Sequence, residues 1–141
     1  MHSVTFPYQR RHHQWIPLIP VTLAGPAGAL QVEAYLDSGA LMSIFDRAIP
    51  DLLGLPLTHA RVQRFIVGDG RFIHGHVVTM PMQIGPRRFR APVAFSAELK
   101  VGFNLLGRRG LYEQFEEIAF QEKRRQVVLR YRHEAAPPPA A

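Results

Sequence analysis

Hydrophobic residues recur at every second position in several segments of this chain, and this period of two constrains its fold more than any other feature. A period of two puts alternate side chains on one face of an extended strand, whereas a helix needs a period of about 3.6. The alternating segments are residues 19–23, 30–36, 78–84, 89–95 and 127–131. We therefore expect a mainly β protein, a small closed β-barrel or sandwich with one or two short helices.

Two pairs of alternating segments have the form of strand–turn–strand units. The first spans residues 19–36 around the turn sequence at 25–28, and it runs directly into Asp37. The second joins residues 61–67 to 71–84 through Asp69-Gly70, and Asp-Gly is a strong signal for a two-residue hairpin turn. Pro81 lacks a backbone N–H, so the second arm of this hairpin is predicted to be partly unpaired.

Two short helices are predicted. One covers residues 48–53, with Pro50 in its first turn and Gly54 just beyond its C-terminal end. The other covers residues 109–115, where Leu111 and Phe115 lie one turn apart on the same face.

The chain of 141 residues has the length of one domain, which we assign to residues 16–133. Residues 1–15 are expected to be an N-terminal arm, and a dimer strand, a pro-segment and a flexible segment all remain open for it. Residues 134–141 (EAAPPPAA) have nothing to bury and are predicted to be disordered.

The chain contains no cysteine, which excludes disulfides, thiolate metal sites and cysteine nucleophiles. Its first twenty residues mix charge, histidine and proline and lack an uninterrupted apolar stretch, and no later stretch is long enough to span a bilayer. We expect a cytoplasmic protein that has no contact with membranes.

An excess of 17 basic over 11 acidic residues gives a net charge of +6, which raises the question of nucleic-acid binding. The arginines are scattered in pairs, a pattern more typical of solvated strand ends than of a binding face, so nucleic acid is not the expected partner. His74 and His76 share one face of a strand, as metal ligands can, but no third ligand is near in the sequence. No metal and no cofactor are predicted.

The segment that follows the first hairpin has the residue types that acid–base chemistry requires. Asp37 follows an apolar strand, and a carboxylate that activates water must sit on a rigid element and face a cleft. The hydroxyl of Ser38 can fix the loop by hydrogen bonding. Gly39 and Ala40 are small enough to let two such loops approach each other.

The order of motifs along residues 16–131 resembles that of retropepsin-like aspartic proteases, most closely the bacterial members. Asp37-Ser38-Gly39 comes first, then a hairpin, then Leu105-Leu106-Gly107 and a short helix. The resemblance implies that Asp37 is the catalytic carboxylate, supported by Ser38, Gly39 and Ala40. It also implies a flap tip over the substrate at Val67, Gly68, Asp69, Gly70 and Arg71, and a segment beneath the catalytic loop at Leu105, Leu106, Gly107 and Arg108. No local acidic partner is expected for Arg108.

The mechanism of that family uses two aspartates, and this chain has one Asp-Ser-Gly. Asp46, Asp51 and Asp69 lie in contexts typical of helix starts and turns. We therefore predict a homodimeric aspartic endopeptidase in which each copy supplies Asp37 and the substrate is a peptide or protein. A catalytically inactive dimerisation or peptide-binding module and a basic nucleic-acid-associated domain remain as alternatives.

Overall fold

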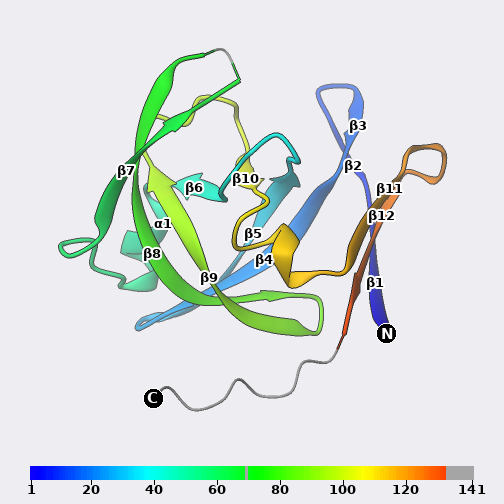
Figure 1. The fold of residues 1–141 in the computed structure, drawn as a ribbon, viewed down its shortest axis with the longest axis horizontal. Helices are drawn as coiled ribbons and strands as arrows, with labels where there is room; N and C mark the ends of the chain where they lie inside the picture. Colours follow the sequence, from blue (N-terminus) through cyan, green and yellow to red (C-terminus); the bar gives the residue numbers. More distant parts are fainter. Residues whose placement is uncertain (69, 133–141) are drawn as a thin grey trace.

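The computed structural model describes residues 1–68 and 70–132 (Figure 1). The chain is mainly β, as predicted, with one short α-helix, α1 (Ile49–Leu53), and two single turns of 3-10 helix, η1 (Tyr112–Gln114) and η2 (Glu122–Arg124). None of the helices in this part of the chain is long and apolar enough to cross a membrane. The strands are β1 (His2–Pro7), β2 (Gln9–Arg11), β3 (Gln14–Ile16), β4 (Leu18–Gly25), β5 (Gly28–Leu36), β6 (Ile44–Asp46), β7 (Arg61–Ile66), β8 (Phe72–Ile84), β9 (Arg87–Ser96), β10 (Asn104–Leu106), β11 (Glu117–Gln121) and β12 (Gln126–Tyr131).

The largest sheet has the strand order β4-β5-β10-β6-β9-β8-β7 and closes on itself through an additional pairing of β4 with β8. Both predicted hairpins belong to it, as β4–β5 and β7–β8. Closure depends on the length of β8, which pairs with β7 in its first half and with β4 near its end. Pro81 lies between these two pairings and contacts only β9 along its edge, in agreement with the predicted unpaired stretch.

A second sheet, β1-β12-β11, joins the two ends of the domain. Strand β1 runs antiparallel to β12, from the pair His2↔Tyr131 to the pair Pro7↔Gln126. Residues 1–15 therefore form strands within this chain and differ from the flexible arm that was one expectation. The physical reason is that Val4 and Phe6 alternate on one face of β1 and pack against the core. The predicted tail, residues 134–141, lies outside the described residues.

The two predicted helices have different outcomes. Helix α1 begins at Ile49 and is followed by Gly54 in a left-handed conformation with φ of 62°, as its sequence predicts. The helix predicted over residues 109–115 is wrong in extent, because only η1 forms there. Gly110 has φ of 89°, which interrupts any helix at that point. Leu111 and Phe115 are nevertheless both buried.

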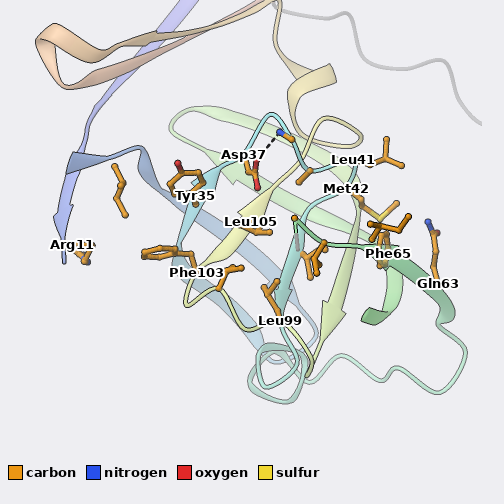
Figure 2. A pocket seen from close by; sticks show the side chains of 18 of the residues that line it. Arg11, Tyr35, Asp37, Leu41, Met42, Gln63, Phe65, Leu99, Phe103 and Leu105 are labelled. Atoms are coloured by element: carbon orange, nitrogen blue, oxygen red, sulfur yellow. Dashed lines mark hydrogen bonds between the residues drawn. The ribbon is translucent and has the colours of Figure 1, made fainter. Parts of the chain in front are cut away.

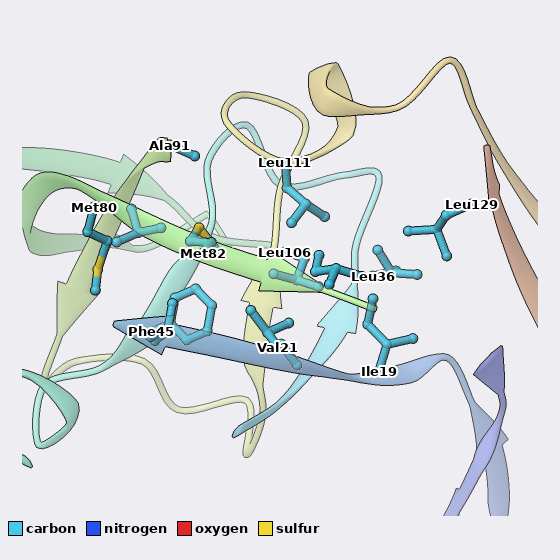
Figure 3. Close-up of a cluster of buried hydrophobic side chains, with 14 of the residues drawn as sticks. Ile19, Val21, Leu36, Phe45, Met80, Met82, Ala91, Leu106, Leu111 and Leu129 are labelled. Carbon is cyan, nitrogen blue, oxygen red and sulfur yellow. The ribbon is translucent and has the colours of Figure 1, made fainter. Parts of the chain in front are cut away.

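The core lies inside the closed sheet and continues under β12 (Figure 3). Val21, Leu36 and Leu106 come from three neighbouring strands and point toward one another with Phe45 beside them. Phe45 is fully buried and lies 6.3 Å from Phe95, centroid to centroid. The alternating segments thus provide the interior of the barrel, and the site described below rests on this packing.

We predict that Phe45→Ala lowers the free energy of unfolding by about 3–5 kcal/mol, because it leaves a cavity in a close-packed interior. Phe120→Ala is the matched control, since that phenylalanine is 40% exposed, and its loss should be below about 1 kcal/mol. Urea unfolding of the two variants measures the difference. Equal losses of unfolding free energy in the two variants would contradict the burial of Phe45 in the core.

Candidate active site

The segment from Asp37 to Ala40 forms a tight turn at the end of β5. The Asp37 N–H donates to the Leu106 carbonyl at 3.0 Å, and the Ala40 N–H donates to the Asp37 carbonyl at 3.1 Å. The Gly39 N–H donates to Asp37 Oδ1 at 2.9 Å, the bond drawn as a dashed line in Figure 2. These bonds fix both the backbone and the carboxylate of Asp37, and the side chain remains partly exposed.

Strand β10 passes beneath this turn. It lies between β5, to which it is parallel, and β6, to which it is antiparallel. Beyond β10, the Arg108 N–H donates to the Ala40 carbonyl at 3.0 Å and the Arg109 N–H donates to the Leu41 carbonyl at 2.7 Å. The structure therefore brings residues 105–108 against the Asp37 loop. Their place beneath a catalytic loop, which the resemblance implied, stays a prediction.

Gly107 lies directly against the backbone of Met42. A Cβ atom on this residue would lie 2.5 Å from the carbonyl oxygen of Met42 and 2.7 Å from its amide nitrogen, closer than real side chains approach. The Gly107 N–H also donates to the buried Ser43 Oγ at 3.0 Å. Only glycine can occupy this position, and Ser43 holds it there.

Ser43 supports the candidate site through this bond, although it was not among the site residues predicted from the sequence. Ser38 was expected to fix the loop, but its side chain is exposed and makes no hydrogen bond within the described part of the chain. Within this chain, the hydroxyl that secures the loop belongs to Ser43. One sequence feature could have identified Ser43, which is the single small polar residue in the apolar run from Met42 to Phe45.

The β7–β8 hairpin arches over one side of the turn. The Val67 N–H donates to the Arg71 carbonyl and the Gly70 N–H donates to the Val67 carbonyl, both at 2.9 Å. Three residues separate Val67 from Arg71, which corrects the predicted two-residue turn. Gly70 has φ of 85°, the positive value that the prediction required. Hairpin loops of three residues commonly end on a residue in the left-handed conformation, which is the position of Gly70. The remaining predicted tip residue, Asp69, lies outside the described residues.

A cleft of about 800 Å³ separates this hairpin from the Asp37 turn (Figure 2). Of the predicted site residues, Asp37, Gly39, Ala40, Val67, Gly68 and Leu105 line it. Ser38, Gly70, Arg71 and Arg108 are exposed outside it, and Leu106 and Gly107 are buried beneath it. The floor is apolar and includes Tyr35, which stacks on Phe103 with ring centroids 5.9 Å apart.

Tyr112 is a second residue that the sequence reasoning did not single out. Burial raises the pKa of its hydroxyl, and the nearby Asp37 and Tyr35 raise it further. The hydroxyl oxygen is buried and has no hydrogen-bond partner among the described residues. Tyr112 therefore stays neutral across the pH range in which proteins fold, and it contributes an uncharged, poorly solvated surface near Asp37.

The two histidines considered as metal ligands lie on β8 away from the cleft lining. His74 Nδ1 is 3.3 Å from Glu98 Oε1, which also accepts the backbone N–H of His74 at 3.0 Å. In residues 1–68 and 70–132, no group of three or more acidic or histidine side chains could hold a metal ion. Arg108 makes no ion pair in this part of the chain.

Comparisons with known proteins define the fold. No protein-family model matches the chain, and no curated protein sequence does. Among solved structures, the chain is similar to a retropepsin-like aspartic protease from Rickettsia conorii, with a TM-score of 0.68 and 16% sequence identity. The match covers 92% of this chain and 99% of that chain. The chain therefore has the retropepsin-like fold that its motifs predicted.

We predict that Gly107→Ala lowers the free energy of unfolding by about 2–3 kcal/mol or more, because the new methyl group overlaps the Met42 backbone. Gly68→Ala is the matched control, since a Cβ atom there meets nothing within 4 Å, and its effect should stay within about 0.5 kcal/mol. Thermal and urea unfolding of the purified variants give both values. A Gly107→Ala variant as stable as Gly68→Ala would contradict the close passage beneath the loop.

Proposed function

We propose that this protein is an aspartic endopeptidase that works as a homodimer. One observation carries the proposal: in a retropepsin-like fold, the Asp37 carboxylate is held by Gly39 at the edge of an open, apolar cleft beneath a hairpin. A fixed carboxylate that faces a cleft can accept a proton from a bound water molecule. The apolar walls suit a peptide in an extended conformation.

The need for a second chain follows from the carboxylates near the cleft. Asp37 is the single acidic residue that lines it within the described part of the chain. Asp46 accepts the Ala48 N–H at 2.8 Å, and Asp51 lies on the exposed face of α1, 4.0 Å from Arg47. Neither of them lines the cleft. A two-fold dimer axis beside the Asp37 turn would bring in Asp37 of the partner subunit.

The surface around the turn suits such an interface. Leu41 and Val101 line the cleft, yet each exposes more than half of its surface in the single chain, 54% and 52%. Large apolar side chains that are exposed together commonly mark a site covered by a partner or ligand. The exposed hydroxyl of Ser38 is free to bond across the axis.

The proposed chemistry balances with two carboxyl groups and one water molecule. Two carboxylates at close range do not both ionise readily, so one is deprotonated and one protonated. The ionised group takes a proton from the water, whose oxygen attacks the peptide carbonyl, and the protonated group donates its proton to the carbonyl oxygen. Collapse of the tetrahedral intermediate transfers a proton to the amide nitrogen and breaks the C–N bond.

We expect Asp37→Asn to abolish peptide hydrolysis, because an amide is nearly the same size but cannot act as a base. Asp51→Asn makes the same chemical change on an exposed side chain outside the cleft and should keep full activity. Hydrolysis of a fluorogenic peptide library at acidic and neutral pH is the measurement. Activity retained in a mass-verified Asp37→Asn protein would refute the assignment. A wild-type dimer that cleaves no peptide would instead favour the inactive binding module.

We also expect Asp37→Asn to strengthen dimerisation at neutral pH. Two facing carboxylates repel each other when both are ionised, by roughly 2–4 kcal/mol at a separation of about 4 Å near a protein surface. The amide removes that repulsion. Protonation removes it from the wild type as well, so the advantage of the variant should shrink as the pH falls. Sedimentation equilibrium of both proteins across the pH range measures it, and equal dimerisation constants at every pH would mean that the two carboxylates do not face each other.

A further inference from the structure

We propose that a basic surface on the side of the β2–β3 hairpin away from the cleft binds single-stranded nucleic acid, with Trp15 as the residue on which a base stacks. The surface consists of Arg10 and Trp15 on that hairpin and of Lys123, Arg124 and Arg125 in and directly after the turn η2. We call it the Trp15 surface. It goes beyond the proposed protease, because none of its residues lines the cleft.

The two faces of the β2–β3 hairpin carry different residues. Arg10 pairs with Trp15 across the two strands, so both side chains project from the same face. The neighbouring pair, Arg11 with Gln14, projects from the opposite face, and both of these residues line the cleft. The face that carries Arg10 and Trp15 is therefore turned away from the cleft.

The β11–β12 hairpin lies beside this face and adds positive charge to it (Figure 1). The Arg125 guanidinium lies 4.6 Å from the centre of the Trp15 ring, and the Arg10 guanidinium lies 5.9 Å from it. Lys123 and Arg124 precede Arg125, and these basic side chains are all exposed. Basic residues from opposite ends of the sequence thus meet at one surface, whereas the expectation against nucleic acid treated the arginine pairs as scattered.

Neighbouring acidic residues leave this positive charge largely uncompensated. Within residues 1–68 and 70–132, no carboxylate forms an ion pair with the basic side chains of the Trp15 surface. Glu122, the acidic residue of the turn η2, accepts the Tyr8 hydroxyl at 2.7 Å. Glu33 pairs with Arg11, which projects from the opposite face of the β2–β3 hairpin. The Trp15 surface is therefore free to attract an anionic ligand.

Backbone strain is concentrated around the same surface. The non-glycine residues with positive φ in the described part of the chain are His12, His13 and Arg125, with φ of 51°, 63° and 53°. Side chains disfavour this conformation, so it persists only where the surroundings hold it, and such residues concentrate at functional sites. The Tyr8 N–H holds Arg125 by donating to its carbonyl at 2.8 Å. An observation independent of charge therefore also singles out this surface.

The chemistry of the Trp15 surface favours single-stranded nucleic acid over other anions. Trp15 exposes 41% of its surface despite both guanidinium contacts, and unpaired bases stack on exposed aromatic rings and on guanidinium planes. Guanidinium groups also bind phosphate oxygens through two parallel hydrogen bonds. An anionic membrane would favour several apolar side chains, and this surface has one. RNA and DNA share the required chemistry, so the test includes both.

Trp15 is the only tryptophan in the chain, so its fluorescence reports binding at this surface directly. The full-length protein is titrated with single strands of about 12 nucleotides, oligouridylate and oligothymidylate, and labelled copies report the affinity by anisotropy. We expect at least one of the two to quench the tryptophan emission, and the tighter of them identifies the kind of nucleic acid. With about four phosphate contacts, the affinity should fall about 50-fold between about 50 and 200 mM NaCl.

Variants locate the binding site. Arg10→Gln combined with Arg124→Gln should lower the affinity about tenfold or more at about 50 mM NaCl and reduce the salt slope by about 1.4. Arg88→Gln combined with Arg90→Gln makes the same change of net charge on β9 and should leave the slope unchanged.

The stacking contact has its own variants. Trp15→Ala should lower the affinity about tenfold without changing the salt slope, because stacking carries no charge. Trp15→Leu takes its place if the alanine variant does not fold. Trp15→Phe keeps an aromatic ring and should retain most of the affinity, measured by anisotropy.

Three results would overturn the inference: no binding of either strand, an equally tight complex with a DNA duplex of the same length, or a β9 variant as impaired as the Arg10 and Arg124 variant. A change in Trp15 emission at lower concentration with phosphatidylglycerol vesicles or with polyglutamate would also overturn it, in favour of a membrane or an acidic protein. Failure of the proposed function looks different. A protein that cleaves no peptide but binds these strands through Trp15 would refute the protease and leave the inference standing.

Discussion

The contact between Gly107 and the backbone of Met42 is the constraint on which the candidate site depends. A chain segment passes beneath the Asp37 turn so closely that no side chain fits at Gly107. Because backbone groups at this depth must be hydrogen-bonded, the buried Ser43 hydroxyl accepts the Gly107 N–H, and the loop carbonyls of Ala40 and Leu41 accept the next two N–H groups. The Asp37 turn thus rests on hydrogen bonds from the segment that follows β10, and the Gly39 N–H holds the carboxylate itself. Such support gives the rigidity that a catalytic group would require.

The side of the cleft opposite this segment is more exposed. There the β7–β8 hairpin packs through Phe65 and Ile73 against Met42 and Ile44, and Ile66 on its outer face exposes 70% of its surface. A fixed carboxylate below and a lightly packed cover above are the arrangement expected when a substrate must enter and leave. Leu41 and Val101 line the cleft and remain more than half exposed in the single chain. Together with the single acidic residue that lines the cleft among the described residues, this exposure supports the proposed second copy.

The sequence predicted the parts of this structure that depend on local patterns. Period-two alternation identified the β4–β5 and β7–β8 hairpins, and the left-handed Gly54 and Gly70 were predicted from their turn contexts. Contacts between distant segments were harder. The role of Ser43 depends on Gly107, 64 residues away, and the pairing of β1 with β12 joins opposite ends of the domain. The left-handed turn at His12 and His13, with φ of 51° and 63°, was not predicted, because histidine is not among the residues that commonly signal a turn. The helix predicted over residues 109–115 is shorter in the structure because Gly110 adopts φ of 89°, which the spacing of Leu111 and Phe115 does not reveal.

In the proposed homodimer, one catalytic centre is built from two chains, each of which contributes Asp37. The most direct test is the stoichiometry with which the protein binds a peptide that carries a statine unit, a tetrahedral hydroxyl-bearing group, in place of the cleaved bond. Native mass spectrometry and isothermal titration calorimetry both report it. We expect one peptide for every two chains, bound only by the dimer. One peptide for every chain, or binding of equal affinity by a monomer, would contradict it.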